Sequence, residues 1–151
     1  MKQEDGSYKS IYCHWDGYPE YNGLILFENY KDKNKVEKLI NLGDISSLDE
    51  EIEPDYRFEH CFSNRQEGIT LAYHRDRGEN INIRTDKNIN DLINYISHSM
   101  EEYLYIYDNG VWKYAEVIYE QPNKIKIVNL KDELINIGII DIYENEININ
   151  I

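Results

Sequence analysis

The amino-acid sequence predicts an α+β fold in which a mixed or antiparallel sheet of about five or six strands carries about two or three helices on one face. Apolar residues recur at helical spacing near residues 36–42 and again over residues 88–100. Short β-prone runs alternate with turn residues elsewhere, and an Asn-Gly pair joins two of these runs. A length of 151 residues fits one α+β domain over residues 1–151, with an Ile-rich C-terminal extension from about residue 122.

The N-terminal third predicts a strand followed by helical segments. Residues 8–14 are β-prone, and this run must end at Asp16-Gly17 and Pro19, because glycine and proline favour a turn and interrupt a strand ladder. The apolar spacing near residues 36–42 then predicts a helix. Asp32 is suited to cap its start, and Gly43 is suited to the left-handed conformation at its end.

An acidic segment follows this helix, after a polar turn over residues 43–48. By default such a segment is a solvated loop, and its functional alternative is a contact loop for a partner with a basic surface. The carboxylates of this candidate contact loop are Asp49, Glu50, Glu51, Glu53 and Asp55.

The second half of the chain predicts a helix and a C-terminal β-meander. Residues 69–73 read as a short strand that places residues 74–79 at its end, and residues 88–100 predict a helix capped by Asn88 or Asp91. Residues 103–107 and 111–119 flank an Asn-Gly turn and predict a hairpin, which a further strand over residues 124–128 extends to a meander.

The hairpin and the C-terminal tail each leave two interpretations. The aromatic face of the hairpin forms either the inner wall of the core or an exposed recognition surface, with the core preferred. The tail predicts a short helix and then a final edge strand over residues 146–151, which could pair with a second copy of the chain to give a homodimer.

The composition limits the class of protein. A formal net charge of −13, from 29 acidic and 16 basic residues, opposes direct binding to nucleic acids and anionic membranes and suits a basic protein partner. Cys13 and Cys61 are too few for a disulfide framework, so we expect both to be reduced. Without an apolar signal segment or a membrane-spanning run, the sequence predicts a soluble cytosolic protein.

Two polar clusters, each at the end of a predicted strand, form the candidate binding site. We expect them to be halves of one site. Its residues are His14, Trp15, Asp16, Tyr18, Tyr73, His74, Arg75, Asp76, Arg77 and Glu79. The sequence assigns no catalytic residue, no cofactor and no metal, because no motif here is specific for a reaction.

Three chemical roles for this candidate site stay open. The His14/Asp16 and His74/Asp76 pairs could ligate a divalent metal or act as acid and base. Arg75 and Arg77, with an aromatic wall, could hold a nucleotide, although no phosphate-binding loop accompanies them. Alternatively the cluster is structural, with the arginines paired to Asp76 or Glu79.

Three segments together resemble a family of small phage and prophage proteins. They are IYCHWDGYP at residues 11–19, LINLGDISSL at residues 39–48 and YHRDRGE at residues 73–79. The resemblance covers about residues 8–80, the aromatic hairpin looks like that of the family, and roughly the last forty residues depart from it. The resemblance implies phage origin and the host cytoplasm, and it brings no established activity.

We therefore expect a non-enzymatic, phage-encoded anti-defence protein. It would bind and inhibit a host defence protein or nucleoprotein, such as a CRISPR-Cas effector, through its acidic and tyrosine-rich surface. The first alternative is a nucleotide-binding or metal-assisted nucleotide-processing protein that uses His14, Asp16 and residues 74–77. The second is a structural or regulatory phage subunit that assembles through its C-terminal edge strand.

Overall fold

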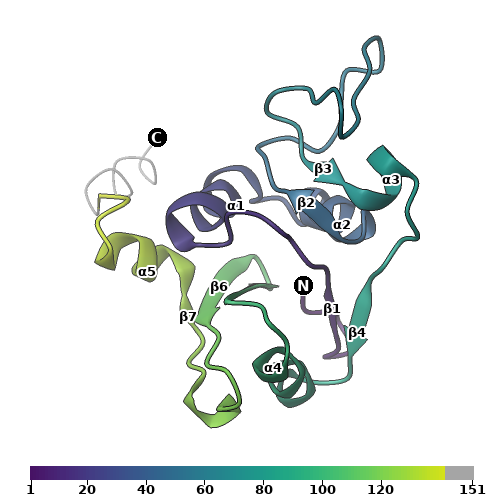
Figure 1. Ribbon diagram of the computed structural model, residues 1–151. Coiled ribbons are helices and arrows are strands. Elements are labelled where there is room, and N and C mark those ends of the chain that lie inside the picture. The colour runs from purple at the N-terminus through teal and green to yellow at the C-terminus, as the bar shows by residue number, and fades with distance from the viewer. Residues whose placement is uncertain (142–151) are drawn as a thin grey trace.

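The computed structural model describes residues 1–141 (Figure 1). The edge strand and homodimer contact expected at residues 146–151 lie outside the described residues. The strands are β1 (Tyr8–Ser10), β2 (Ile45–Ser47), β3 (Leu71–Ala72), β4 (Arg84–Asp86), β5 (Tyr103–Asp108), β6 (Val111–Glu116) and β7 (Val128–Asn129). The helices are η1 (Pro19–Gly23, a π-helical turn), α1 (Leu24–Asn29), α2 (Lys33–Asn41), α3 (Tyr73–Arg77), α4 (Ile89–His98), η2 (Pro122–Lys124, a 3-10 turn) and α5 (Leu130–Asn136).

The α+β class is confirmed, whereas the single sheet of five or six strands is wrong. Within residues 1–141, β1 pairs with β4, β2 pairs with β3, and β5, β6 and β7 form a separate meander, all antiparallel. The first four strands have two or three residues each, and a register shift interrupts the β2–β3 pair. Such short ladders make too few hydrogen bonds to merge into one continuous sheet.

The C-terminal meander follows the predicted hairpin closely. Asn109 and Gly110 both adopt positive φ angles, 51° and 86°, as a two-residue hairpin turn requires. The register places Tyr107 opposite Trp112 and Tyr105 opposite Tyr114, as the turn predicts. This meander is the largest sheet in the described part of the chain.

Helices cover both faces of the meander, so the prediction that they pack on one face is wrong. The face carrying Leu104 and Ile106 packs against Leu92 and Ile96 of α4. The aromatic face carries Tyr114, which packs against the fully buried Leu130 and Leu134 of α5. Because side chains alternate along a strand, one hairpin supplies both surfaces. Figure 1 shows α4 on one side of the hairpin and α1 with α5 on the other.

The aromatic face of the hairpin is a core wall, as preferred from the sequence. Tyr107 and Tyr114 are buried, and the indole Nε1 of Trp112 donates to the carbonyl of Tyr30 at 2.8 Å. The phenol of Tyr105 donates to the carbonyl of Gly17 at 2.6 Å. These hydrogen bonds join the meander to the N-terminal half of the chain.

The predicted caps of the two longer helices are confirmed. The Asp32 carboxylate accepts a hydrogen bond from the amide of Asn34 at the start of α2, and Asn88 accepts one from Asp91 at the start of α4. Gly43 adopts a φ of 75° just after α2. No helix within residues 1–141 has both the length and the apolar character needed to span a bilayer.

Candidate functional site

The two predicted site segments flank the same strand, β2. Residues 12–15 run beside β2 through hydrogen bonds such as Ile45 N–H to Tyr12 O at 2.8 Å, while β3 pairs with its other edge. Asp44 touches both segments, since its carboxylate accepts from the amide of Tyr12 and its carbonyl accepts from the amide of Tyr73. Within residues 1–141, no hydrogen bond or ion pair joins a side chain of residues 14–18 to one of residues 73–79.

Around the N-terminal segment, four predicted site residues form an exposed rim of three aromatic rings and one carboxylate. The ring of His14 packs edge-on against Trp15 with centroids 4.6 Å apart, and its Nδ1 lies 2.9 Å from the Tyr12 hydroxyl. Trp15 and Tyr18 are both exposed. Asp16 adopts a φ of 58°, which turns the chain before Pro19, and its carboxylate accepts a weak 3.4 Å hydrogen bond from Tyr18. Each of these side chains is available to a partner.

The second segment folds into helix α3 instead of a loop at a strand end. Gly78, with a φ of 75°, ends this five-residue helix. His74 Nδ1 donates to the carbonyl of Glu79 at 2.7 Å, and Arg77 pairs with Glu79 at 2.6 Å on the exposed side. The helical turn directs Arg75 and Asp76 inward, where they meet the long connection between β2 and β3.

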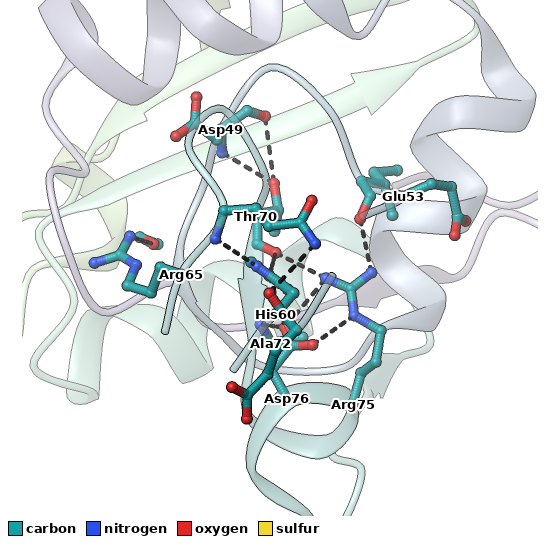
Figure 2. Close-up of polar contacts among 12 residues, drawn as sticks. Asp49, Glu53, His60, Arg65, Thr70, Ala72, Arg75 and Asp76 are labelled. Carbon is teal, nitrogen blue, oxygen red and sulfur yellow. Dashed lines mark hydrogen bonds and ion pairs between the residues drawn. The ribbon is translucent and has the colours of Figure 1, made fainter. Parts of the chain in front are cut away.

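Asp76 is the centre of a buried polar network (Figure 2). Its carboxylate accepts hydrogen bonds from the amide of Ala72 at 2.7 Å and from the Arg75 guanidinium at 2.9 Å, and its side chain is 3% exposed. Arg75 also donates to the carbonyl of Ile52 at 2.7 Å and to that of Thr70 at 2.8 Å. One guanidinium therefore ties α3 to both ends of the β2–β3 connection.

His60 completes the network from within the connection. Its Nδ1 accepts a hydrogen bond from the amide of Gln66 at 3.0 Å, so the ring hydrogen lies on Nε2. Nε2 faces the carbonyl of Thr70 at 3.2 Å and the carboxylate of Asp76 at 3.5 Å. Both ring nitrogens are thus occupied by the protein itself, and His60 holds the connection in place.

A second set of contacts anchors the start of the acidic segment. The fully buried Tyr30 donates to the carbonyl of Asp49 at 2.7 Å, and Thr70 accepts from the amide of Asp49 at 2.9 Å. Lys35, from α2, donates to the carbonyl of Glu50 at 2.6 Å and lies 3.6 Å from the Glu51 carboxylate. The segment is therefore held by its main chain, while Glu50, Glu51 and Glu53 face solvent.

At the tip of this connection lie two exposed aromatic residues that the sequence interpretation missed. Tyr56 is 78% exposed and Phe58 is 66% exposed. Gln66 closes the base of the tip by donating to the carbonyl of Asp55 at 2.9 Å and to that of Phe58 at 3.2 Å. Figure 1 shows this connection projecting from the rest of the molecule. The sequence signal for these exposed residues is that two aromatic side chains lie in an acidic stretch without the periodic spacing of buried residues.

The tip is flanked by carboxylates whose partners within residues 1–141 are neighbouring residues of the tip. Glu53 accepts from the Tyr56 hydroxyl at 2.7 Å, and Asp55 forms a two-point contact with Arg57. The hydrogen bonds that Arg57 donates to the Asp55 carboxylate lower the pKa of that carboxyl. We refer to residues 49–59 as the acidic loop. Its exposed surface combines negative charge with aromatic rings, and its main chain is held in place by hydrogen bonds.

The predicted phosphate and metal contacts find little support in this geometry. Arg75 is engaged with Asp76 and two carbonyls, and Arg77 lies over the rings of Phe62 and Tyr73 at 4.3 and 5.0 Å. In residues 1–141 no group of three or more His, Cys, Asp or Glu side chains is placed to hold a metal ion. Arg75 instead supports the acidic loop through its hydrogen bond to the carbonyl of Ile52, and Arg77 contacts Glu79, Phe62 and Tyr73.

Comparison with protein-family models, with curated proteins and with solved structures found no match for this chain.

Proposed function

We propose that the chain is a binding protein that uses the acidic loop to occupy a basic surface of a protein partner. The observation that carries this proposal is the tip of the loop, where Tyr56 and Phe58 are exposed on a main chain anchored by partly buried hydrogen bonds. Exposed aromatic residues on a fixed support are typical anchors of protein interfaces, because little conformational entropy is lost when they are buried.

The charge of the loop defines the partner. Glu50, Glu51 and Glu53 are exposed in a protein whose net charge is −13, so a basic surface would be attracted and steered to the loop. Proteins that hold nucleic acids carry such surfaces. The resemblance of three sequence segments to phage proteins supports a host defence nucleoprotein, such as a CRISPR-Cas effector in the host cytoplasm, as the partner.

The test is protection of a phage in cells that carry an active CRISPR-Cas system. Expression of the wild-type chain is expected to restore plaque formation, whereas Tyr56→Ala with Phe58→Ala is expected to abolish it. The matched control, Tyr119→Ala with Val111→Ala, removes two other exposed apolar side chains and should leave protection intact. Full protection by the loop variant, or no protection by the wild type, would overturn the proposal.

Charge reversal separates electrostatic attraction from aromatic contact. Replacing Glu50 and Glu53 by lysine should weaken inhibition of the purified effector and reduce its sensitivity to salt, because fewer favourable charge pairs remain to be screened. The same reversal at Glu116 and Glu120, away from the loop, is the control. Equal inhibition by both pairs would contradict the electrostatic part of the proposal.

The nucleotide-binding alternative stays a prediction that no observed contact favours. Its phosphate ligands would have to include Arg75, whose donors are already used by Asp76 and two carbonyls. A thermal-shift panel of nucleotides with divalent metals tests it directly. A stabilising shift that Arg75→Ala removed, in a variant that still folds, would revive this alternative.

A further inference from the structure

A cavity of about 460 Å³ lies between the N-terminal segment and the start of β5. One wall is formed by residues 10–14 and 16–18, another by residues 101–105, and Leu92 and Ile96 of α4 contribute to the lining. The hydrogen bond from Tyr105 to the carbonyl of Gly17 connects the two walls. This volume lies within the range of about 300–1,000 Å³ that is usual for small-molecule sites.

In the described part of the chain, β5 lies at an edge of the meander, and this edge borders the cavity. Tyr107 accepts a hydrogen bond from the amide of Lys2 on this edge, and the alternation of an antiparallel strand turns the main-chain groups of Tyr103 and Tyr105 the same way. Beyond Lys2, the N-terminal chain leaves β5 to pair with β4 and then with β2. Within residues 1–141, the main-chain groups of Tyr103 and Tyr105 therefore have no strand partner along this wall of the cavity.

Two buried side-chain oxygens in residues that line the cavity have no hydrogen-bond partner in the described part of the chain. They are Oδ1 of Asn22 and Oε2 of Glu101. Asn22 is 3% exposed, and its amide nitrogen donates to the carbonyl of Trp15 at 3.0 Å, which fixes the orientation of the amide. Both unpartnered atoms are acceptors, so a ligand must supply hydrogen-bond donors.

The lining has more carboxylates than cationic groups and is rich in aromatic rings. Asp16, Asp44, Glu101 and Glu102 contribute carboxylates. Met1 also lines the cavity, and its N-terminal ammonium donates to the carbonyl of Lys9 at 2.7 Å, while the Arg84 guanidinium is held by Asp86 at 2.9 Å and lies over the ring of Tyr95. Burial, followed by the influence of Tyr73, Glu101, Cys13 and Asp44, raises the pKa of the Tyr12 phenol. The tyrosine rings that line the cavity are those of Tyr12, Tyr18, Tyr95, Tyr103 and Tyr105. Negative charge beside aromatic faces favours an organic cation.

We infer that this cavity is a binding site for a small organic cation, with a guanidinium, amidinium or primary ammonium group attached to an apolar body. The cationic group donates hydrogen bonds to the carboxylate of Glu101 and to the amide oxygen of Asn22, and the apolar body packs against the tyrosine rings. Anionic ligands, including nucleotides, are excluded by the surrounding carboxylates. The site is separate from the acidic loop and does not depend on the function proposed for that loop.

Three ligands of nearly the same shape test the inference. Benzamidine is a cation, benzamide is neutral and benzoate is an anion. In a titration followed by amide NMR shifts, benzamidine is expected to bind and to shift residues 12–17 and 101–105, while benzoate leaves them unchanged and benzamide binds more weakly. Equal binding of all three ligands, or shifts confined to other residues, would overturn the inference.

A charge-neutral variant identifies the group that holds the cation. Glu101→Gln keeps the size of the side chain and is expected to weaken benzamidine binding by about tenfold, as the loss of one charge-assisted hydrogen bond implies. Glu67→Gln makes the same charge change at an exposed position outside the cavity and should leave the affinity unchanged. The inference fails if the two variants bind benzamidine equally well.

Free cations and arginine side chains of a partner share this chemistry, and two further probes distinguish them. Agmatine represents a free metabolite, and an acetylated, amidated peptide with one internal arginine represents a partner. Binding of agmatine alone would assign a metabolite site, whereas binding of the peptide would assign the cavity to a partner's arginine. Failure of both probes, with no response to benzamidine, would exclude an organic-cation site.

Discussion

At the scale of single residues, two neighbouring ion pairs, one within α3 and one from α3 to the residue after its glycine cap, have different roles. Arg75–Asp76 and Arg77–Glu79 look equivalent in the sequence, and the structural interpretation of the cluster anticipated such pairs. Asp76 is nevertheless buried with Ala72 and His60 around it, while Arg77 and Glu79 are each about half exposed. Only the direction of the helical turn decides which pair is buried, and the sequence does not reveal it.

Asp76→Ala is expected to lower the free energy of unfolding by about 3 kcal/mol, because it leaves the Arg75 guanidinium without its carboxylate inside the network. Glu79→Ala, its matched control, should cost less than about 1 kcal/mol, since its ion pair is exposed to water. Urea denaturation followed by circular dichroism measures both. Similar small losses in the two variants would mean that the network does not support the fold.

Titration of the single residue Tyr30 is expected to make the stability of the fold depend on pH. Burial raises the pKa of its phenol to about 12, while the unfolded chain titrates near 10. The folded state keeps its proton longer, so the stabilising contribution is complete below about pH 10 and is lost as the pH rises toward about 12. Tyr30→Phe should flatten the decline of stability over this window in denaturation curves. An unchanged slope would contradict the assignment.

At the scale of elements, the sequence predicted the helix caps and the hairpin turn, because these features depend only on residues close together in the chain. Caps at Asp32 and Asn88 and the Asn109-Gly110 turn are decided within a few residues, and the structure confirms all three. Helix α3 was missed because five residues are too few to show helical periodicity. The acidic loop carries no periodic pattern, so its anchoring by Tyr30 and Arg75 could not be predicted.

Helix α5 packs into the core, so part of the C-terminal segment is expected to contribute to stability. Leu134 is fully buried against Tyr114, so Leu134→Ala should lower the free energy of unfolding by about 2–5 kcal/mol. Val128→Ala, at a 41% exposed position only a few residues away, should change it by less than about 0.5 kcal/mol. A negligible effect of Leu134→Ala in chemical denaturation would show that the segment after residue 122 is dispensable for folding.

At the scale of the whole molecule, the main error of the sequence interpretation concerns how strands assemble. Strand-forming runs were recognised, but which runs pair depends on contacts between residues far apart in the chain, such as Tyr8 with Asp86. The divergence of the N-terminal segment from β5 splits the expected sheet and opens the cavity. Neither the cavity nor the shared strand β2 between the two site segments could be inferred from local patterns.

The central claim is that the acidic loop is an ordered platform held by the network around Asp76, and amide hydrogen exchange tests it most directly. The amides of Asp49, Gln66, Thr70 and Ala72 donate hydrogen bonds in the structure, so they should exchange slowly, whereas the tip amides of Tyr56 and Glu59 should exchange fast. Asp76→Ala should remove the protection of these four amides and leave α4 and the β5–β6 hairpin protected. Exchange at the rate of an unstructured chain throughout residues 49–70 of the wild-type protein would contradict the claim.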